Sequence, residues 1–170
     1  MKEPCLIPHW CSILAVDPGN TSGWALYKWG RLVSYGKVTE RELFADGPAH
    51  VIRQLLNQPG PHVVVLERPF RIRFQNQATM GTALKVWAQR AKEARITRVL
   101  RVYPPTWRTI LPKLPKGTKR DRKALRAQEA EWAEKMLGQP KVHPDISPAL
   151  LMGRWAAFAG EVRALLTGVA

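Results

Sequence analysis

The stretch that decides the fold is Ser12-Ile13-Leu14-Ala15-Val16-Asp17-Pro18-Gly19, an apolar run that ends in an acid and a turn. A short apolar run bounded by Pro-Gly is typical of a buried central strand. A second run, Val63-Val64-Val65-Leu66, has the β-branched character of a strand buried on both faces, and Glu67 follows it. Both strands therefore end in a carboxylate at the point where the core should be closing.

The remaining pattern predicts a meander followed by alternating helices and strands. Further strands are predicted over 23–27, 31–38 and 97–103, the first two joined by a hairpin at Trp29-Gly30. Apolar spacing predicts helices over 49–56, 75–94, about 120–137 and about 147–166. This order predicts an α/β protein with a mixed five-stranded sheet flanked by helices.

The charge of the chain is strongly one-sided. Among 170 residues, 27 Lys and Arg stand against 13 Asp and Glu, which gives a formal net charge of +14. Such an excess favours a polyanionic partner, because each phosphate neutralised by Lys or Arg releases counterions. No long basic amphipathic face or lipidation signal is present, so nucleic acid is favoured over a membrane surface.

Length and cysteine content limit the class of protein. We expect one domain over 1–170, with a short N-terminal extension at 1–11 and a basic loop at about 111–123. The two cysteines, Cys5 and Cys11, are too few for a disulfide framework and lack the spacing of a zinc site. With no signal peptide and no apolar run of membrane-spanning length, we expect a reduced, intracellular protein.

Asp17, Glu67 and Asp145 are the candidate metal ligands. Two-metal hydrolysis of a phosphodiester needs several carboxylates around cations about 3.5–4 Å apart, and Mg²⁺ prefers oxygen donors. Asp17 and Glu67 would meet at one sheet edge if their strands are neighbours, and Asp145 can come beside them. Each acid also has a structural interpretation: an Asx turn for Asp17, a pair with Arg68 or another basic side chain for Glu67, and an N-cap for Asp145.

Several segments resemble the RuvC-type Holliday-junction resolvases. They are 13–19 with Gly23-Trp24-Ala25, then 63–69, 103–108, the Lys-rich tract of the basic loop at about 111–123, and Ala149-Leu150-Leu151-Met152-Gly153. The resemblance covers about residues 12–160. It implies a ribonuclease-H-like fold, a homodimer, two Mg²⁺ or Mn²⁺ ions per active site, and paired nicks across a four-way junction. It also implies the cytoplasm of a bacterial or phage-infected bacterial cell.

The last motif departs from the family pattern, which has two acids three residues apart before Ala-Leu, or His in place of the first. Aligned on Ala149-Leu150, the first position is Asp145 and the second is Pro148. We favour Asp145 as the completing ligand and keep His143 as a second candidate, because His is a poor Mg²⁺ ligand but an able proton acceptor. We also expect Asp145 or Ser147 to cap the last helix, with Pro148 in its first turn.

The predicted DNA-binding residues lie after Glu67 and in the basic loop. Phe70 can stack on an unpaired base, a contact of about 1–3 kcal/mol in single-strand binders, and the resemblance also implies an aromatic at this offset; the alternative is that Phe70 caps the core. Trp107 could stack or pack, and Trp87 is interpreted as core or dimer interface. Phosphate contacts are expected from Arg71, Arg73, Arg108, Lys113, Lys116, Lys119 and Arg120.

Two other functions remain open. Residues 17–23 also resemble the phosphate loop of actin-like ATPases and sugar kinases, but those proteins need a second phosphate loop and a second domain. A non-catalytic, structure-selective DNA-binding protein is favoured if Pro148, at the position of the second acid in the family pattern, means that the metal site has degraded. Asp17 and Glu67 argue for the nuclease.

Overall fold

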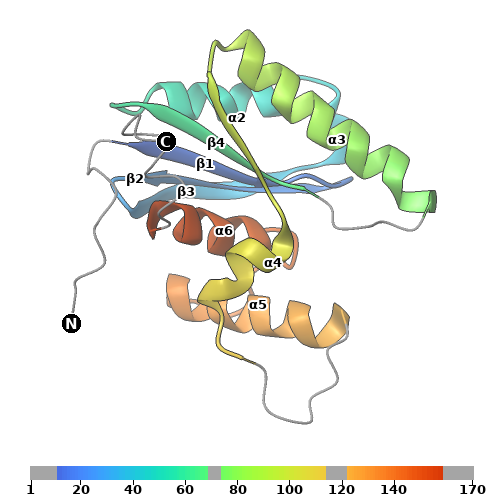
Figure 1. Ribbon diagram of the computed structural model, residues 1–170, viewed down its shortest axis with the longest axis vertical. Coiled ribbons are helices and arrows are strands. Elements are labelled where there is room, and N and C mark those ends of the chain that lie inside the picture. Colours follow the sequence, from blue (N-terminus) through green and yellow to red (C-terminus); the bar gives the residue numbers. More distant parts are fainter. Residues whose placement is uncertain (1–10, 69–73, 114–121, 159–170) are drawn as a thin grey trace.

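The computed structural model describes residues 11–68, 74–113 and 122–158 (Figure 1). The strands are β1 Ser12–Asp17, β2 Ser22–Lys28, β3 Arg31–Val38, β4 His62–Glu67 and β5 Arg98–Val102. The helices are α1 Glu40–Leu43, α2 Gly47–Leu56, α3 Phe74–Glu93, α4 Pro104–Trp107, the 3-10 turn η1 Arg108–Ile110, α5 Arg122–Leu137 and α6 Ser147–Phe158.

The five strands form one mixed sheet in the order β3-β2-β1-β4-β5. The β1–β2 and β2–β3 pairs are antiparallel, whereas β1–β4 and β4–β5 are parallel. Trp29 and Gly30 both have positive φ, 54° and 74°, as a tight two-residue hairpin between β2 and β3 requires. The predicted mixed five-stranded sheet and its hairpin are confirmed.

Helices cover both faces of the sheet. Successive side chains of a strand point to opposite faces, so Ile13 and Ala15 of β1 join the core beneath α6, and Leu14 and Val16 join the core beneath α2 and α3. Figure 1 shows α2 and α3 on one side of the sheet, and α6, α4 and α5 on the other. None of the helices in the described ranges is both long and apolar enough to cross a bilayer.

The short elements and the start of α6 differ from the sequence prediction. Helices α1 and α4 and the turn η1 were not predicted, because pieces of three or four residues are too short to show a periodicity. The expected cap was wrong: the Leu150 N–H donates to the Ile146 carbonyl at 3.1 Å, so Ile146 holds the cap position. Pro148 does lie in the first turn, as expected. The predicted end of this helix near residue 166 lies outside the described residues.

Candidate active site

The two strand-end acids lie in one row across the sheet. Asp17 pairs with Gly23 of β2, and the β1–β4 register runs through Val16 opposite Leu66. One further step along this register brings Asp17 level with Glu67. Residues level with each other in paired strands point to the same face, and for Asp17 this is the face beneath α6, which Ala15 shares. The sheet therefore places both carboxylates side by side under α6.

Asp145 reaches the same row through a close backbone approach. A Cβ atom built on Gly23 would lie only 1.7 Å from the Asp145 carbonyl oxygen, so the segment before α6 packs directly on the strand beside Asp17. Only glycine leaves room for that contact. The Asp145 carboxylate, with its side chain 35% exposed, is also one of the charges that raise the pKa of Asp17.

Burial and mutual repulsion hold protons on the two strand-end acids. Loss of solvation, and then the charges of Glu129 and Asp145, raise the pKa of Asp17 to about 7. Burial, and then the charge of Asp17, raise the pKa of Glu67 to about 8. Neighbouring carboxylates that each make ionisation of the other unfavourable are typical of sites that bind a cation or carry out acid–base chemistry.

Trp107 fixes the orientation of Glu67. The fully buried Trp107 Nε1–H donates to Glu67 Oε2 at 2.7 Å, and Glu67 itself is only 8% exposed. This hydrogen bond lowers the pKa of Glu67 and so opposes part of the effect of burial. Trp107 belongs to α4, so that short helix, absent from the prediction, positions a side chain of the candidate site.

A fourth acid, Glu129 of α5, was missed by the sequence prediction. It is only 2% exposed, and Arg108 Nε donates to its Oε1 at 2.6 Å. Among the charges that raise the pKa of Asp17, that of Glu129 ranks ahead of that of Asp145. A signal was present: Glu129 continues the inward-facing stripe of Ala133 and Leu137 at steps of four residues, where an apolar side chain is the ordinary choice.

His143 lies on the β3 side of this row. Its Nε2 is 3.3 Å from Lys37 Nζ, and the Asp145 backbone N–H points at its Nδ1 from 3.3 Å. A neutral imidazole accepts through only one nitrogen, so the two contacts cannot both be hydrogen bonds to that form. Lys37 belongs to β3 and pairs with Gly23 of β2. Strands β1 and β2 therefore lie between the strand of Lys37 and β4, the strand of Glu67. His143 stays a prediction as a ligand or base.

The predicted DNA contacts divide into described and undescribed residues. Arg108 pairs with Glu129 and lies 5.0 Å from the centre of the Trp107 ring, while Lys113 is exposed. Among the described residues, Arg68 makes no ion pair with Glu67 and instead lies 5.2 Å from the centre of the Tyr103 ring. Outside the described residues lie Phe70, Arg71, Arg73, Lys116, Lys119 and Arg120.

The donor set suits Mg²⁺ or Mn²⁺ by its chemistry. Carboxylate oxygens are the ligands that these cations prefer, and Asp17, Glu67, Glu129 and Asp145 all contribute to the electrostatics of one region. Within the described ranges, no three His, Cys, Asp or Glu side chains are gathered closely enough to form a metal cluster. A cation would relieve the repulsion that raises the pKa values of Asp17 and Glu67.

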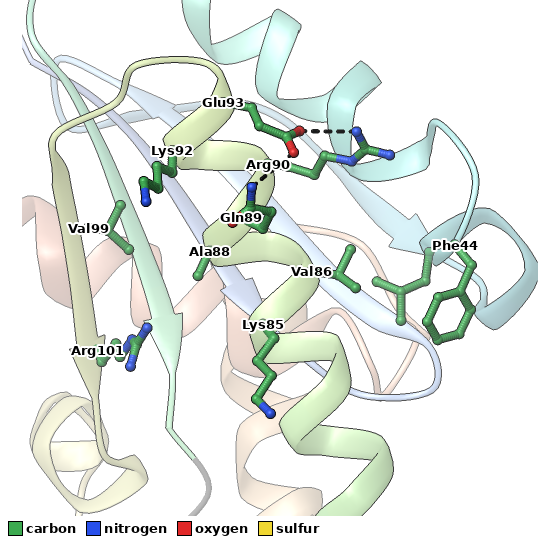
Figure 2. Close-up of a pocket in the computed structure, with 11 residues that line it drawn as sticks. Phe44, Lys85, Val86, Ala88, Gln89, Arg90, Lys92, Glu93, Val99 and Arg101 are labelled. Carbon is green, nitrogen blue, oxygen red and sulfur yellow. Dashed lines mark hydrogen bonds and ion pairs between the residues drawn. The ribbon is translucent and has the colours of Figure 1, made fainter.

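A separate hollow of about 940 Å³ lies between α3, β5 and the end of α1. Figure 2 shows Lys85 and Lys92 of α3, Arg101 of β5, and the aromatic ring of Phe44 around it. Arg101 neighbours Val102, whose side chain joins the opposite core beneath α6. The hollow and the four acids therefore lie on opposite faces of the sheet.

Comparison with solved structures shows the fold of this chain. It is similar to Thermus thermophilus RuvC in complex with a Holliday junction substrate, with a TM-score of 0.66 and 18% identity over 89% of this chain and 96% of that one. A second structure of Thermus thermophilus RuvC gives a TM-score of 0.63 and 19% identity over the same shares. No protein-family model and no curated protein sequence matches the chain. The ribonuclease-H-like fold expected from the sequence is confirmed.

Proposed function

We propose that this protein is a divalent-metal-dependent endonuclease that resolves Holliday junctions and related branched DNA by paired nicks. The observation that carries this proposal is the row in which Asp17 and Glu67 lie level on adjacent strands, within a fold similar to that of RuvC. Neighbouring carboxylates at one sheet edge, here the half-buried Asp17 and the buried Glu67, are what a cation-dependent phosphodiesterase needs to hold its metal ions.

In this proposal the acids bind the cations and the surrounding residues position the acids. Asp17, Glu67 and Asp145 would hold Mg²⁺ or Mn²⁺, which, when bound, activates a water molecule for attack on the phosphodiester and stabilises the leaving oxygen. Trp107 keeps the Glu67 carboxylate in one orientation through its 2.7 Å hydrogen bond. His143 is the second candidate for accepting a proton from the attacking water.

The charge of the chain supports DNA as substrate. The net charge of +14 favours binding to a polyanion, and the predicted phosphate contacts flank the acids in sequence. Paired nicks on two strands need two active sites, which a homodimer of this domain, 1–170, would supply. We expect it to act in the cytoplasm of a bacterial or phage-infected bacterial cell.

A non-catalytic DNA-binding protein is the second candidate. Pro148 at an expected acid position, and the absence of a gathered metal cluster among the described residues, favour it. An actin-like ATPase fragment is disfavoured, because the fold likeness to RuvC extends over 96% of the RuvC chain.

Cleavage of a synthetic four-way junction tests the proposal. Wild type with Mg²⁺ or Mn²⁺ should release paired nick products, whereas Asp17→Asn and Glu67→Gln should bind the junction without cutting it. Asp145→Asn should also lose cleavage; an active Asp145→Asn would remove this residue from the site. Junction binding without cleavage by wild type would support the non-catalytic candidate.

A further inference from the structure

Helix α6 exposes only two of its residues, Arg154 and Phe158, and buries all the others. The two are four positions apart, so they lie next to each other on one side of the helix. The Arg154 guanidinium lies 5.1 Å from the centre of the Phe158 ring, and it makes no ion pair with any described residue. The outer side of α6 therefore presents one aromatic ring with one cation over it.

Helix α5 presents a similar pair to the same space. Lys135 Nζ lies 5.5 Å from the centre of the ring of Trp132, three positions earlier on the helix. Figure 1 shows α5 beside α6, on the side of α6 away from the sheet. The pairs of α5 and α6 line one hollow of about 470 Å³, a volume typical of small-molecule sites. Its remaining lining residues are apolar: Ile110 of η1, Met136 and Leu151.

The charge of this hollow is positive. None of the described residues that line it is Asp or Glu, and two are cations. Glu131 pairs with Lys135 at 2.6 Å, but Glu131 does not line the hollow. The hollow therefore complements an anionic ligand, as does the net charge of +14 on the whole chain.

A third aromatic–cation pair adjoins Phe158. Lys28 Nζ lies 4.5 Å from the centre of the ring of Trp29, which is 48% exposed. A Cβ atom built on the next residue, Gly30, would lie 3.9 Å from Phe158 Cζ, so the β2–β3 hairpin reaches the end of α6. Exposed rings with cations over them thus come from the hairpin, α6 and α5.

The hollow adjoins the candidate active site through the α4–η1 segment. Trp107, which donates to Glu67, precedes Ile110 of the hollow by only three residues. A strand held in the hollow can therefore continue along this segment toward the acids at the ends of β1 and β4.

Packing alone explains less of this surface. Single exposed apolar side chains are ordinary, and Phe44 on the opposite face of the sheet is one: it is 60% exposed, and no described cation lies over its ring. Rings interleaved with cations along a groove are instead typical of single-strand binding surfaces, where bases stack on the rings and cations meet the phosphates. An acidic peptide would also meet the cations, but the neighbouring candidate nuclease site favours DNA.

We propose that the hollow between η1, α5 and α6 is a binding site for unpaired DNA. Trp132 and Phe158 stack on its bases, and Lys135 and Arg154 contact its phosphates. This inference deepens the proposed function and rests on it for DNA as the partner, but binding can be measured without cleavage.

Fluorescence anisotropy of a labelled oligothymidylate with the full-length protein in EDTA tests it. The double variant Trp132→Leu with Phe158→Leu keeps apolar side chains but removes both rings, and it should weaken oligothymidylate binding at least about 10-fold. The double variant Trp132→Phe with Phe158→Tyr keeps two rings and should bind within about 3-fold of wild type. Phe44→Leu is the matched control, an exposed aromatic replaced on the opposite face, and should bind as wild type does.

Two further measurements separate stacking on unpaired bases from general attraction to DNA. A blunt duplex should bind the double Leu variant as it binds wild type, because its bases are not free to stack on the rings. Arg154→Gln should lower the slope of log affinity against log salt for the oligothymidylate by about 0.7, the value for one phosphate contact. An unchanged slope would remove Arg154 from the site.

Three results would overturn the proposal: a wild-type protein that does not bind oligothymidylate, wild-type affinity in the double Leu variant, or an equal loss in Phe44→Leu. Wild-type affinity in the double Leu variant would leave the hollow to a protein partner. An equal loss of duplex binding in that variant would contradict a site for unpaired DNA.

Junction cleavage by the same proteins distinguishes this inference from the proposed function. Ring-dependent binding of oligothymidylate without cleavage by wild type would sustain the binding site and refute the nuclease. Cleavage by wild type together with unchanged oligothymidylate binding in the double Leu variant would do the reverse.

Discussion

The two faces of the sheet each bury a tryptophan completely, but they use it differently. Trp87 of α3 lies in the core beneath α2 and α3, and its Nε1–H has no hydrogen-bond partner among the described residues. Trp107 lies on the α6 face and donates its Nε1–H to Glu67. One face is an apolar core, while the other combines an apolar core with charged groups at its edge.

This difference shows how one set of strands serves both the packing of the cores and the placing of the candidate site. Because side chains alternate, Val16 and Leu66 continue the apolar core beneath α2 and α3, while the next residues, Asp17 and Glu67, face α6. Acids at the strand ends therefore leave the first core intact. Substitutions matched across the two faces can separate the two roles.

The largest effect is expected for Gly23→Ala. The added Cβ would meet the Asp145 carbonyl oxygen at 1.7 Å, so the backbone before α6 must move. We expect a loss of at least about 3 kcal/mol in the free energy of unfolding, and loss of junction cleavage. Gly81→Ala in α3 is the matched control, because its Cβ meets nothing within 4 Å. Urea denaturation should show it gaining up to about 1 kcal/mol; equal losses in both would contradict the close approach at Gly23.

A smaller effect is expected when pH changes in the metal-free protein. The pKa of Asp17 is raised from 3.8 to about 7 and that of Glu67 from 4.5 to about 8. Between about pH 4 and pH 8 the folded state therefore holds more protons than the unfolded state, and stability falls as pH rises. We expect a fall on the order of 2–3 kcal/mol between pH 5 and pH 9 in EDTA, discounted for the coupling of the two acids.

The control for this pH dependence is the double variant Asp17→Asn with Glu67→Gln. It lacks both ionisations, so its free energy of unfolding should fall less over the same pH range, and urea denaturation at several pH values measures the difference. An identical slope in the two proteins would assign the dependence to other groups.

The smallest effect is the difference between Trp107→Phe and Trp87→Phe. Both substitutions remove the same volume from a fully buried site, but only Trp107→Phe removes a hydrogen bond to a carboxylate. We expect Trp107→Phe to cost about 1 kcal/mol more and to raise the pKa of Glu67 further. Cleavage should fall in Trp107→Phe alone; comparable cleavage in the two variants would show that Trp107 is only a packing residue.

The fold was predictable because its signals are local and long enough to read. Apolar runs ending at Asp17 and Glu67 mark β1 and β4, and helical spacing marks α3. Trp87 of α3 was interpreted as a residue of the core or of a dimer interface, and the structure places it in the core. The α4–η1 segment was missed, and with it the contacts of Trp107 and Arg108. Its pieces, of four and three residues, are too short for an apolar spacing to recur, and a helix is predicted from that recurrence.

The sequence by itself determined the position of an acid at the end of two strands, the mixed sheet and the positive net charge. Strands and helices are read from the pattern of apolar residues along short stretches of chain, and the net charge is read from the residue counts. Only the tertiary structure showed that Gly23 admits the backbone of Asp145 and that the charge of the buried Glu129 acts on Asp17. Each of these two interactions joins residues more than 100 positions apart, and no local pattern encodes them. Burial gives the charge of Glu129 this effect, because a charge removed from water is screened less, and only the packing of α5 on α6 determines that burial.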